Sequence, residues 1–459
     1  MPSDLREFIA ESDNVLQVSN RSPKFIFPSI IRESLDSEDG PIVFQKVNSI
    51  SDRTFYPEVT RMVGGVYGSE KRIRQIFPSS VRDKSDAELV SFFDDCCKEK
   101  NSLFRISDTA PCHEFIIDDP ENYDLSRLLP ICIHDKRDKG PFITAGVQVV
   151  ELSDGVMGLG IHRMYHIREN LFGCLAPPNR RVGRPYVENP TTSTPLAVCI
   201  GAPPVVVLAS QAKVPHDHSK YCVANNLMES GKLELVRCLT SNILVPAYTE
   251  IVLECETVPG KTVDDTPFLE YTGTYSMRSN AFVVAVKKIT MRKDAIYQTI
   301  VTGRPPQEDG YLCSIPYAAE VLRVARSLSV KVTDISVFFG NCVFDTVLCI
   351  KKESDYQVRN LIYSLLGNKY LKTVSIMDDD LHANETDWRF AFNTRFRPAE
   401  DMIVTEPMLG ASLDPSARVF QTTSKVGLDL TIPDESDKIA FRRGGYSITN
   451  VLQYKNEEG

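Results

Sequence analysis

Short apolar runs dominate the middle of the chain, roughly from Pro111 to Pro305. They are rich in Val, Ile and Thr, and Gly and Pro turns interrupt them. Runs of this length and composition are typical of strands, and their close spacing favours antiparallel connections. The runs are FITAGVQVVEL from Phe142, LAVCIGA from Leu196, VVVLAS from Val205, LELVRCL from Leu233, EIVLECETV from Glu250 and FVVAVKKITM from Phe282. We therefore expect a mainly antiparallel barrel or sandwich.

Helix-like patterns flank this strand-rich segment. Before it, a helix is predicted from about Asp86 to Glu99. Ser85 is the predicted start because its hydroxyl can accept a hydrogen bond from the free amides of the first turn. After the segment, helices near Tyr317–Leu328 and Asp355–Leu366 alternate with strand patterns near 330–339, 347–352 and 373–380. This alternation predicts βαβ-type order.

Chain length and these changes in pattern predict three domains. A chain of 459 residues is too long for one hydrophobic core of ordinary size. We expect an α/β domain over 1–108, the antiparallel domain over 109–305 and a second α/β domain over 306–459. The expected fold class is therefore multidomain, with α+β and α/β parts.

Composition and charge exclude several classes of function. The net charge is −9 without a long basic run, so nucleic acid is not an expected partner. The N-terminus, MPSDLREFIAESDNV, is acidic where a secretory signal would be basic and then apolar. No stretch approaches the ~20 apolar residues of a membrane span. We expect a cytoplasmic protein whose 12 cysteines are reduced and mostly buried as small apolar side chains.

Seven strings spread over most of the chain carry a family resemblance. They are HDKRDKGPFITAG from His134, GIHRM from Gly160, GAPPVVVLAS from Gly201, LELVRCLTSNILVPAYTEIVLE from Leu233, TPFLEYTGTYS from Thr266, TRFRP from Thr394 and SKVGLDLTIP from Ser424. In order and spacing, from about Leu129 to Pro433, the chain resembles the UbiD family of decarboxylases, and its phenylacrylic acid decarboxylases in particular.

The resemblance implies a fold, a reaction and partners. The implied fold has an N-terminal α/β domain, a central flavin-binding split β-barrel and a C-terminal α/β domain that forms a homodimer. The implied reaction is non-oxidative decarboxylation of an α,β-unsaturated or aromatic acid, in either direction, with prenylated FMN supplied by a flavin prenyltransferase. Decarboxylation leaves a carbanion, so an electron sink and an acid are both needed. In the family, the prenylated flavin is the sink, through a covalent adduct with the substrate.

Three residues match the family's catalytic network of one arginine and two acids. They are Arg163 in GIHRM, Asp265 in DDTPFLE and Glu270. Arg163 is permanently cationic and can hold a carboxylate, while Glu270 is the expected proton donor. Asp265 departs from the family, which has Glu there. The shorter side chain leaves two outcomes open, a network kept by a backbone shift or a slack one.

Further positions match the family's flavin-binding cleft. Lys425 in SKVGLDL matches a lysine that grips the cofactor phosphate, since a cation suits a dianion. Asn179 and Arg180 in APPNRR are further candidates. Backbone groups of Gly160, Ile161 and His162, and of Ser210 and Ala212, are expected to line the same cleft beside Arg163.

The family's metal ligands are not matched. The family binds a divalent cation between flavin phosphate and protein through Asn, His and Glu, which suit such a cation. Here the three positions fall on Gly158, on Arg180 and near Tyr221. One hypothesis is that Arg180, with Arg181 or Lys213, neutralises the phosphate directly. Another is a relocated site at His216 and His218. Whether Mn, Mg or K binds is left open.

Two alternatives from other classes are compatible with the sequence. In the first, the chain keeps the fold as a binding or assembly protein and has lost the prenylated cofactor. In the second, it binds unmodified FMN for another reaction, which the fold alone would permit. The identity of the acid is also left open.

Overall fold

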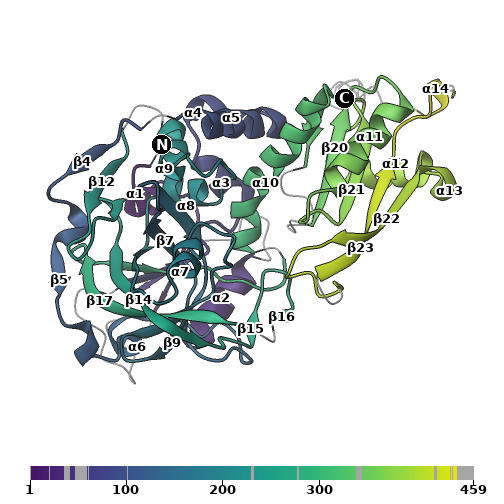
Figure 1. Cartoon of the computed structure of the whole chain (residues 1–459). Helices are drawn as coiled ribbons and strands as arrows, with labels where there is room; N and C mark the ends of the chain where they lie inside the picture. The colour runs from purple at the N-terminus through teal and green to yellow at the C-terminus, as the bar shows by residue number, and fades with distance from the viewer. Residues whose placement is uncertain are drawn as a thin grey trace, which may run out of the picture.

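The structure is a computed structural model, and it places two bodies on either side of one long helix, α10 (Figure 1). The described residues are 2–19, 21–35, 42–46, 59, 61–100, 102–228, 232–276, 279–305, 307–336, 344–417, 421–434, 436 and 438–441. The larger body holds most of the chain before α10, and the smaller body holds the C-terminal strands and helices.

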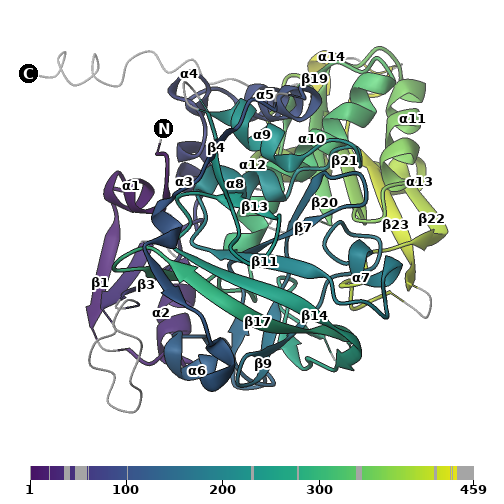
Figure 2. The ribbon, with the colours of Figure 1, turned by 60° about the vertical axis from the view of Figure 1, so that its left-hand side comes forward.

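An antiparallel sheet of nine strands forms the centre of the larger body. Its strand order is β6 (Phe142–Ile143), β9 (Met164–Arg168), β10 (Leu171–Cys174), β17 (Ala281–Met291), β14 (Ile251–Val263), β11 (Pro195–Ile200), β7 (Gly146–Glu151) and β8 (Met157–Ile161), with β5 (Phe115–Ile117) also paired to β17. The long strands β14 and β17 cross the face shown in Figure 2. Antiparallel pairing is confirmed throughout this sheet. Within the described residues the sheet is open, ending at β6 and β8, so a closed barrel is not found.

Smaller sheets connect distant parts of the chain. One has the order β1 (Val15–Ser19), β2 (Ile42–Lys46), β3 (Arg61–Gly64) and β18 (Ile296–Gln298); another has the order β13 (Leu244–Pro246), β12 (Glu234–Arg237) and β4 (Arg105–Ser107). β3 pairs in parallel with β18, and β4 with β12. The N-terminal strands are thereby tied to the central segment, and the three-domain division stays a prediction.

Helix α5 (Asp86–Lys98) begins where the sequence predicts. The Ser85 side chain accepts from the Glu88 amide, and the Glu88 carboxylate accepts from the Ser85 amide at 3.2 Å, which completes a capping box. Its apolar face is buried against neighbouring helices. The other short helices are α1 (Leu5–Ala10), α2 (Ile26–Leu35), α3 (Glu70–Gln75), α4 (Ser79–Arg82), α6 (Leu125–Leu128), α7 (Arg184–Glu188) and α9 (Lys220–Leu227), with 3-10 turns at Pro111–His113 and Pro120–Asn122.

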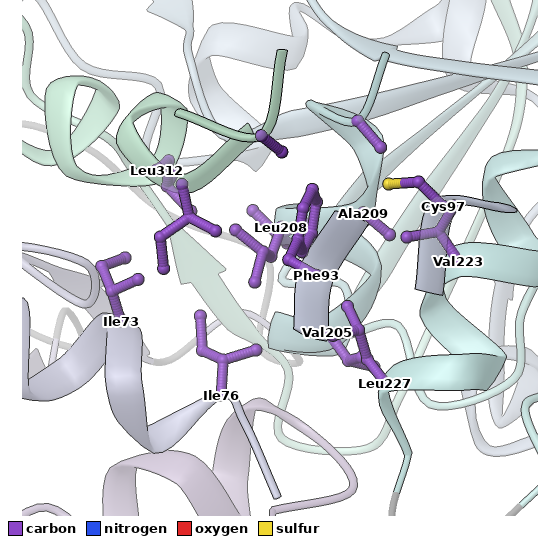
Figure 3. Packing of buried hydrophobic residues seen from close by; sticks show 14 of the residues in the cluster. Ile73, Ile76, Phe93, Cys97, Val205, Leu208, Ala209, Val223, Leu227 and Leu312 are labelled. Carbon is purple, nitrogen blue, oxygen red and sulfur yellow. The ribbon is translucent and has the colours of Figure 1, made fainter. Parts of the chain in front are cut away.

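The run VVVLAS is a helix, so its prediction as a strand is wrong. Helix α8 (Pro204–Ser210) starts with a proline in its first turn, where a missing amide costs nothing. All seven of its residues are buried. Figure 3 shows Val205, Leu208 and Ala209 packed against Phe93 of α5 and Leu227 of α9. Burial on every side explains why the run lacks helical periodicity.

The C-terminal body confirms the predicted βαβ order. Its strands are β19 (Val332–Ile335), β20 (Asp345–Ile350), β21 (Thr373–Asp378), β23 (Thr422–Asp429) and β22 (Met402–Leu409), in that spatial order. β20, β21 and β23 are parallel, and α11 (Asp355–Leu366) connects β20 to β21. The remaining helices are α10 (Glu308–Ser327), α12 (Glu385–Thr394), α13 (Pro398–Asp401) and α14 (Lys438–Phe441). α10 begins well before the predicted Tyr317 and runs through Pro316.

The cysteines are packed as apolar side chains, as expected. Ten of the eleven described cysteines are buried, Cys313 is intermediate, and all eleven are free. Cys342 lies outside the described residues. None of the described helices combines the length and the apolar character needed to cross a bilayer.

Candidate active site

Arg163 lies between the end of β8 and the start of β9, where it joins two acidic side chains. Its Nε donates to Oδ2 of Asp265 at 2.7 Å, and its Nη2 donates to Oδ1 at 3.0 Å. Its Nη1 donates to Oε1 of Glu270. The three residues expected to act together are therefore in direct contact. The shorter Asp265 still binds Arg163 with both oxygens, so the network is not slack.

Local backbone structure positions both acids. The amide of Asp265 donates to Oγ of Ser279 at 2.8 Å. Glu270 follows β15 (Phe268–Leu269) in a tight hairpin with β16 (Tyr275–Ser276), and its amide donates to the carbonyl of Thr274 at 2.9 Å. The ring of Phe268 lies under the Arg163 guanidinium, 4.6 Å from centroid to Cζ.

The network is shielded from water. The exposed fraction of the side chain is 8% for Arg163, 0% for Asp265 and 10% for Glu270. Burial acts to lower the pKa of Arg163, but the hydrogen bonds and charges of Asp265 and Glu270 outweigh it and raise the pKa. Arg163 therefore stays cationic, and Glu270 retains a small exposed surface.

Two acids at the start of α10 were not expected from the sequence. Glu308 is fully buried and accepts from the amides of Tyr67 and Val301 at 3.2 and 3.1 Å. Burial raises the pKa of Asp309 to about 8, and the charges of Glu308 and Glu270 act in the same direction. Burial also raises the pKa of Glu308 to about 7. Asp309 therefore lies within electrostatic range of the predicted proton donor.

A second group of side chains, here called the basic cluster, consists of Arg180, Lys213 and Lys220. Arg180 donates to the hydroxyl of Tyr370, and Nζ of Lys213 lies 5.2 Å from the centroid of the same ring. Lys220, the first residue of α9, donates to the carbonyl of Ser210 at the end of α8. Lys220 was not singled out from the sequence, because a lone lysine at a helix start has no distinguishing pattern.

His162 connects the basic cluster to the acidic network, because it precedes Arg163 in the chain. Its carbonyl accepts from Nε2 of the buried Gln148 at 2.6 Å. Burial, followed by repulsion from the basic cluster, lowers the pKa of the His162 imidazole to about 3. Gly160 and Ile161 belong to β8. A Cβ at Gly160 would lie 3.0 Å from Nε2 of His162, so the strand leaves little space there.

The remaining predicted cofactor residues lie in different surroundings. Ser210 and Ala212 are buried at the end of α8, and the Ser210 hydroxyl donates to the carbonyl of Val207 at 2.7 Å. Asn179 is exposed in the turn before Arg180. Lys425 on β23 is buried and donates to the carbonyls of Leu366 and Asn368 at 2.9 and 2.6 Å. Burial lowers the pKa of Lys425 to about 8.

Two family models match consecutive parts of the chain. Residues 105–305 match the 3-octaprenyl-4-hydroxybenzoate carboxy-lyase Rift-related domain, named UbiD, and residues 310–430 match its C-terminal domain. Anhydromevalonate phosphate decarboxylase of Methanothermobacter thermautotrophicus is 32% identical over 315 residues, which cover 68% of this chain and 73% of the relative. The chain belongs to the UbiD family. It is therefore a carboxy-lyase, a decarboxylase of the UbiD class.

Further proteins resemble the chain in sequence or in fold. The decarboxylase of the same description from Archaeoglobus fulgidus is 33% identical over 311 residues, 66% of this chain and 70% of the relative. The UbiD-class enzyme HmfF from Pelotomaculum thermopropionicum, solved in complex with FMN, has a TM-score of 0.87 and 25% identity over 98% of this chain and 100% of its own. Vanillic acid decarboxylase of Sedimentibacter hydroxybenzoicus has a similar fold, with a TM-score of 0.84 and 20% identity over 100% of this chain and 98% of its own.

The UbiD metal positions of this chain do not fit a divalent cation. Gly158 has no side chain to act as a ligand, and a Cβ there would lie close to Cβ of Arg181 and Cγ2 of Val150, at 3.1 and 3.3 Å. Tyr221 is buried, and its hydroxyl donates to the carbonyl of Leu244 at 2.9 Å. Arg180 repels a cation. Across the described ranges, no three side chains of His, Cys, Asp or Glu group as metal ligands would.

Arg181, His216 and His218, the other residues considered near the metal positions, lie in different surroundings. Arg181 donates to the carbonyl of His218 at 2.8 Å and to those of Val214 and Pro215, so it holds a loop in place. His216 is exposed whereas His218 is buried. Among the described residues, neither histidine belongs to a group of three side chains that could hold a metal ion.

Proposed function

We propose that this chain removes CO2 from an α,β-unsaturated or aromatic carboxylic acid with prenylated FMN as its cofactor. The observation that carries the proposal is the buried contact of Arg163 with Asp265 and Glu270. A cation and a carboxyl group at one enclosed position match the two needs of the reaction, since the substrate carboxylate must be held and the carbon left behind must be protonated. Prenylated FMN, when bound, supplies the electron sink.

Arg163 and Glu270 have separate roles in the proposed reaction. Arg163 orients the substrate carboxylate through its guanidinium. When the carbon–carbon bond to the carboxylate breaks, CO2 leaves without the bonding electron pair, which stays on the former α-carbon or ring carbon. Protonated Glu270 then gives its proton to that carbon and is reprotonated from water. Asp265 is a positioning residue, because both its oxygens are taken up by Arg163.

The proposal also includes the barrel fold, the homodimer and the cofactor supply that the family resemblance implies. We expect the antiparallel sheet to belong to a split barrel that holds the flavin, and residues 306–459 to form the contact of a homodimer. A flavin prenyltransferase would supply the cofactor in the cytoplasm. We expect the flavin to lie along Gly160, Ile161, His162 and the basic cluster. Lys425 of the C-terminal body is expected at its phosphate end.

A phosphorylated unsaturated acid is a second candidate substrate. Relatives between 31% and 33% identical are anhydromevalonate phosphate decarboxylases. The basic cluster supports this candidate too, since a phosphate ester on the substrate would meet the same charges. An aromatic acid without a phosphate group would not contact those charges itself, and they would bind only the flavin phosphate.

Mass spectrometry of the cofactor tests the proposal. The chain is co-expressed with a flavin prenyltransferase, and the small molecules released on denaturation are identified. We expect prenylated FMN, followed by CO2 release from one member of a panel of cinnamic-type, aromatic and phosphorylated unsaturated acids. Release of unmodified FMN alone would favour a different flavin reaction. Folded protein without any flavin would contradict the proposal.

A further inference from the structure

We propose that Arg180, Lys213 and Lys220 form a phosphomonoester site that needs no divalent cation. The flavin phosphate is the first ligand to consider, and in that respect the inference rests on the proposed function. A phosphorylated substrate would bring the same chemical group. The basic cluster thus takes the place that a metal ion holds in a site with Asn, His and Glu ligands.

The three members of the cluster come from separate elements of the larger body, and Tyr370 of the C-terminal body contacts two of them. Arg180 comes from the turn after β10, Lys213 follows α8 and Lys220 begins α9. Tyr370, which follows α11, contacts Arg180 through its hydroxyl and Lys213 through its ring. Tyr317 of α10 packs edge-on against Tyr370, with ring centroids 5.3 Å apart, and lies 4.9 Å from Nζ of Lys213. The site therefore lies where α10 separates the larger body from the C-terminal body (Figure 1).

The positive charge of the cluster is not balanced locally. No described carboxylate forms an ion pair with any of its three members. The charge of Glu320 acts to raise the pKa of Lys213, and the Cys313 thiol adds no charge, because burial raises its pKa to about 12. Burial and then repulsion from Arg180 lower the pKa of Lys213 to about 8. Burial and repulsion from the other cations also lower the pKa of Lys220.

Arg180, Lys213 and Lys220 are half-buried and lie close enough to repel one another without a paired carboxylate, so the arrangement suits an anion. A phosphomonoester carries up to two negative charges and accepts several hydrogen bonds, which suits one guanidinium and two ammonium groups. Binding such an anion would restore the ordinary protonation of both lysines. A divalent cation would add to the repulsion instead. Arg181 is not part of the site, because backbone carbonyls occupy its guanidinium.

The position of the cluster fits a ligand that reaches the acidic network. His162 feels the charges of all three cations, and Arg163 is the next residue along the chain. One dipeptide between β8 and β9 therefore joins the phosphate site to the reacting end. A ligand with a phosphate at one end and the reacting group at the other can span both.

Affinity for FMN measured without turnover tests the inference. FMN and riboflavin are titrated into EDTA-treated protein by fluorescence quenching, and inorganic phosphate by calorimetry. Wild type is expected to bind FMN more tightly than riboflavin without added metal. Lys213→Met and Lys220→Met are each expected to weaken FMN about 10- to 100-fold, the range for a lost hydrogen bond to a charged group, and to leave riboflavin unchanged.

Matched variants separate charge from folding. Lys220→Arg keeps the charge and is expected to retain most of the FMN affinity, while Lys261→Met removes an exposed lysine of β14 and should change nothing. Circular dichroism and the melting temperature confirm that each variant folds. If the Met variants lose phosphate binding but keep FMN affinity, the site serves a phosphorylated substrate.

Two outcomes would overturn the inference. One is a wild-type protein that binds FMN only when Mg²⁺ or Mn²⁺ is present. The other is a pair of lysine variants that bind both FMN and inorganic phosphate like wild type. Neither result depends on decarboxylation, so failure of this inference is distinguishable from failure of the proposed reaction.

Discussion

Asp265 shows how a side chain shorter than the glutamate expected at its position can still bind an arginine with both carboxylate oxygens. Its carboxylate has no exposed surface and forms two hydrogen bonds with Arg163. The next residue along the chain, Thr266, is joined to Pro267 by a cis peptide bond. A sequence reports the length of the side chain but not the backbone position that compensates for it. The sequence therefore left two outcomes open, and the structure selects the intact network.

At the same scale, Asp309 makes stability depend on pH. Its pKa is raised to about 8 in the folded protein, above its ordinary value of 3.8. The folded state then holds a proton that the unfolded state has released. The stability that Asp309 contributes is therefore fully present below about pH 4 and is lost as the pH rises through 8. We expect Asp309→Asn to reduce the fall in melting temperature between pH 6 and pH 9.

Differential scanning calorimetry of wild type and variant across this range checks the prediction. Asp379→Asn, which removes an exposed acid, is the matched control and should leave the pH dependence of wild type intact. Parallel curves for wild type and Asp309→Asn would show that Asp309 does not retain its proton on folding.

The residues of the site differ in how far the sequence predicts them. Arg163, Asp265 and Glu270 lie in strings that resemble a family, and the structure places all three in contact. Lys220 and Asp309 lie outside any such match, because their importance comes from burial near other charges. Burial of a single polar side chain is a property of tertiary packing, which local sequence patterns do not report.

At the scale of elements, the alternation of strand and helix patterns and the capping residues predict secondary structure better than a run of β-branched residues does. The capping residues of α5 and the order of β20, α11 and β21 follow from local patterns, and both are confirmed. The run at α8 was misassigned, because Val and Ile favour strands on average and a helix buried on all sides has no polar face. Pro203 and Pro204 before that run were the available signal for a helix start.

Contact between α11 and β23 depends on Gly427. A Cβ at this position would lie 2.1 Å from Cγ2 of the buried Ile362. We expect Gly427→Ala to destabilise the C-terminal body by about 1–3 kcal/mol, the usual cost of overpacking a core. Urea denaturation followed by circular dichroism measures the loss.

A second substitution tests the stated cause. Ile362→Ala alone is expected to cost about 2–5 kcal/mol, as for other large-to-small core changes. Combined with Gly427→Ala it should cost less than the sum, because the new methyl group enters the space that Ile362 leaves. Strictly additive losses would mean that the two positions do not press on each other.

At the scale of the whole molecule, the proposed catalytic residues and the basic cluster lie near the junction of the two bodies. Tyr271 follows Glu270, and its ring centroid lies 6.0 Å from that of Phe344. Arg180 and Lys213 both contact Tyr370 beyond α11. A change in the angle between the bodies would therefore act on both ends of the site. Strand patterns predicted the sheets, but not which side chains meet across this junction, because such contacts depend on long-range packing.

The central claim is that Glu270 protonates the carbon from which CO2 has left. Steady-state decarboxylation by Glu270→Gln, loaded with the same cofactor as wild type, tests it most directly. The variant keeps the size of the side chain and removes the acid, so kcat should fall by about 10²- to 10⁴-fold, the usual contribution of a general acid. Glu385→Gln, an exposed change, serves as the control. Equal activity of Glu270→Gln and wild type, with cofactor content matched, would contradict the account.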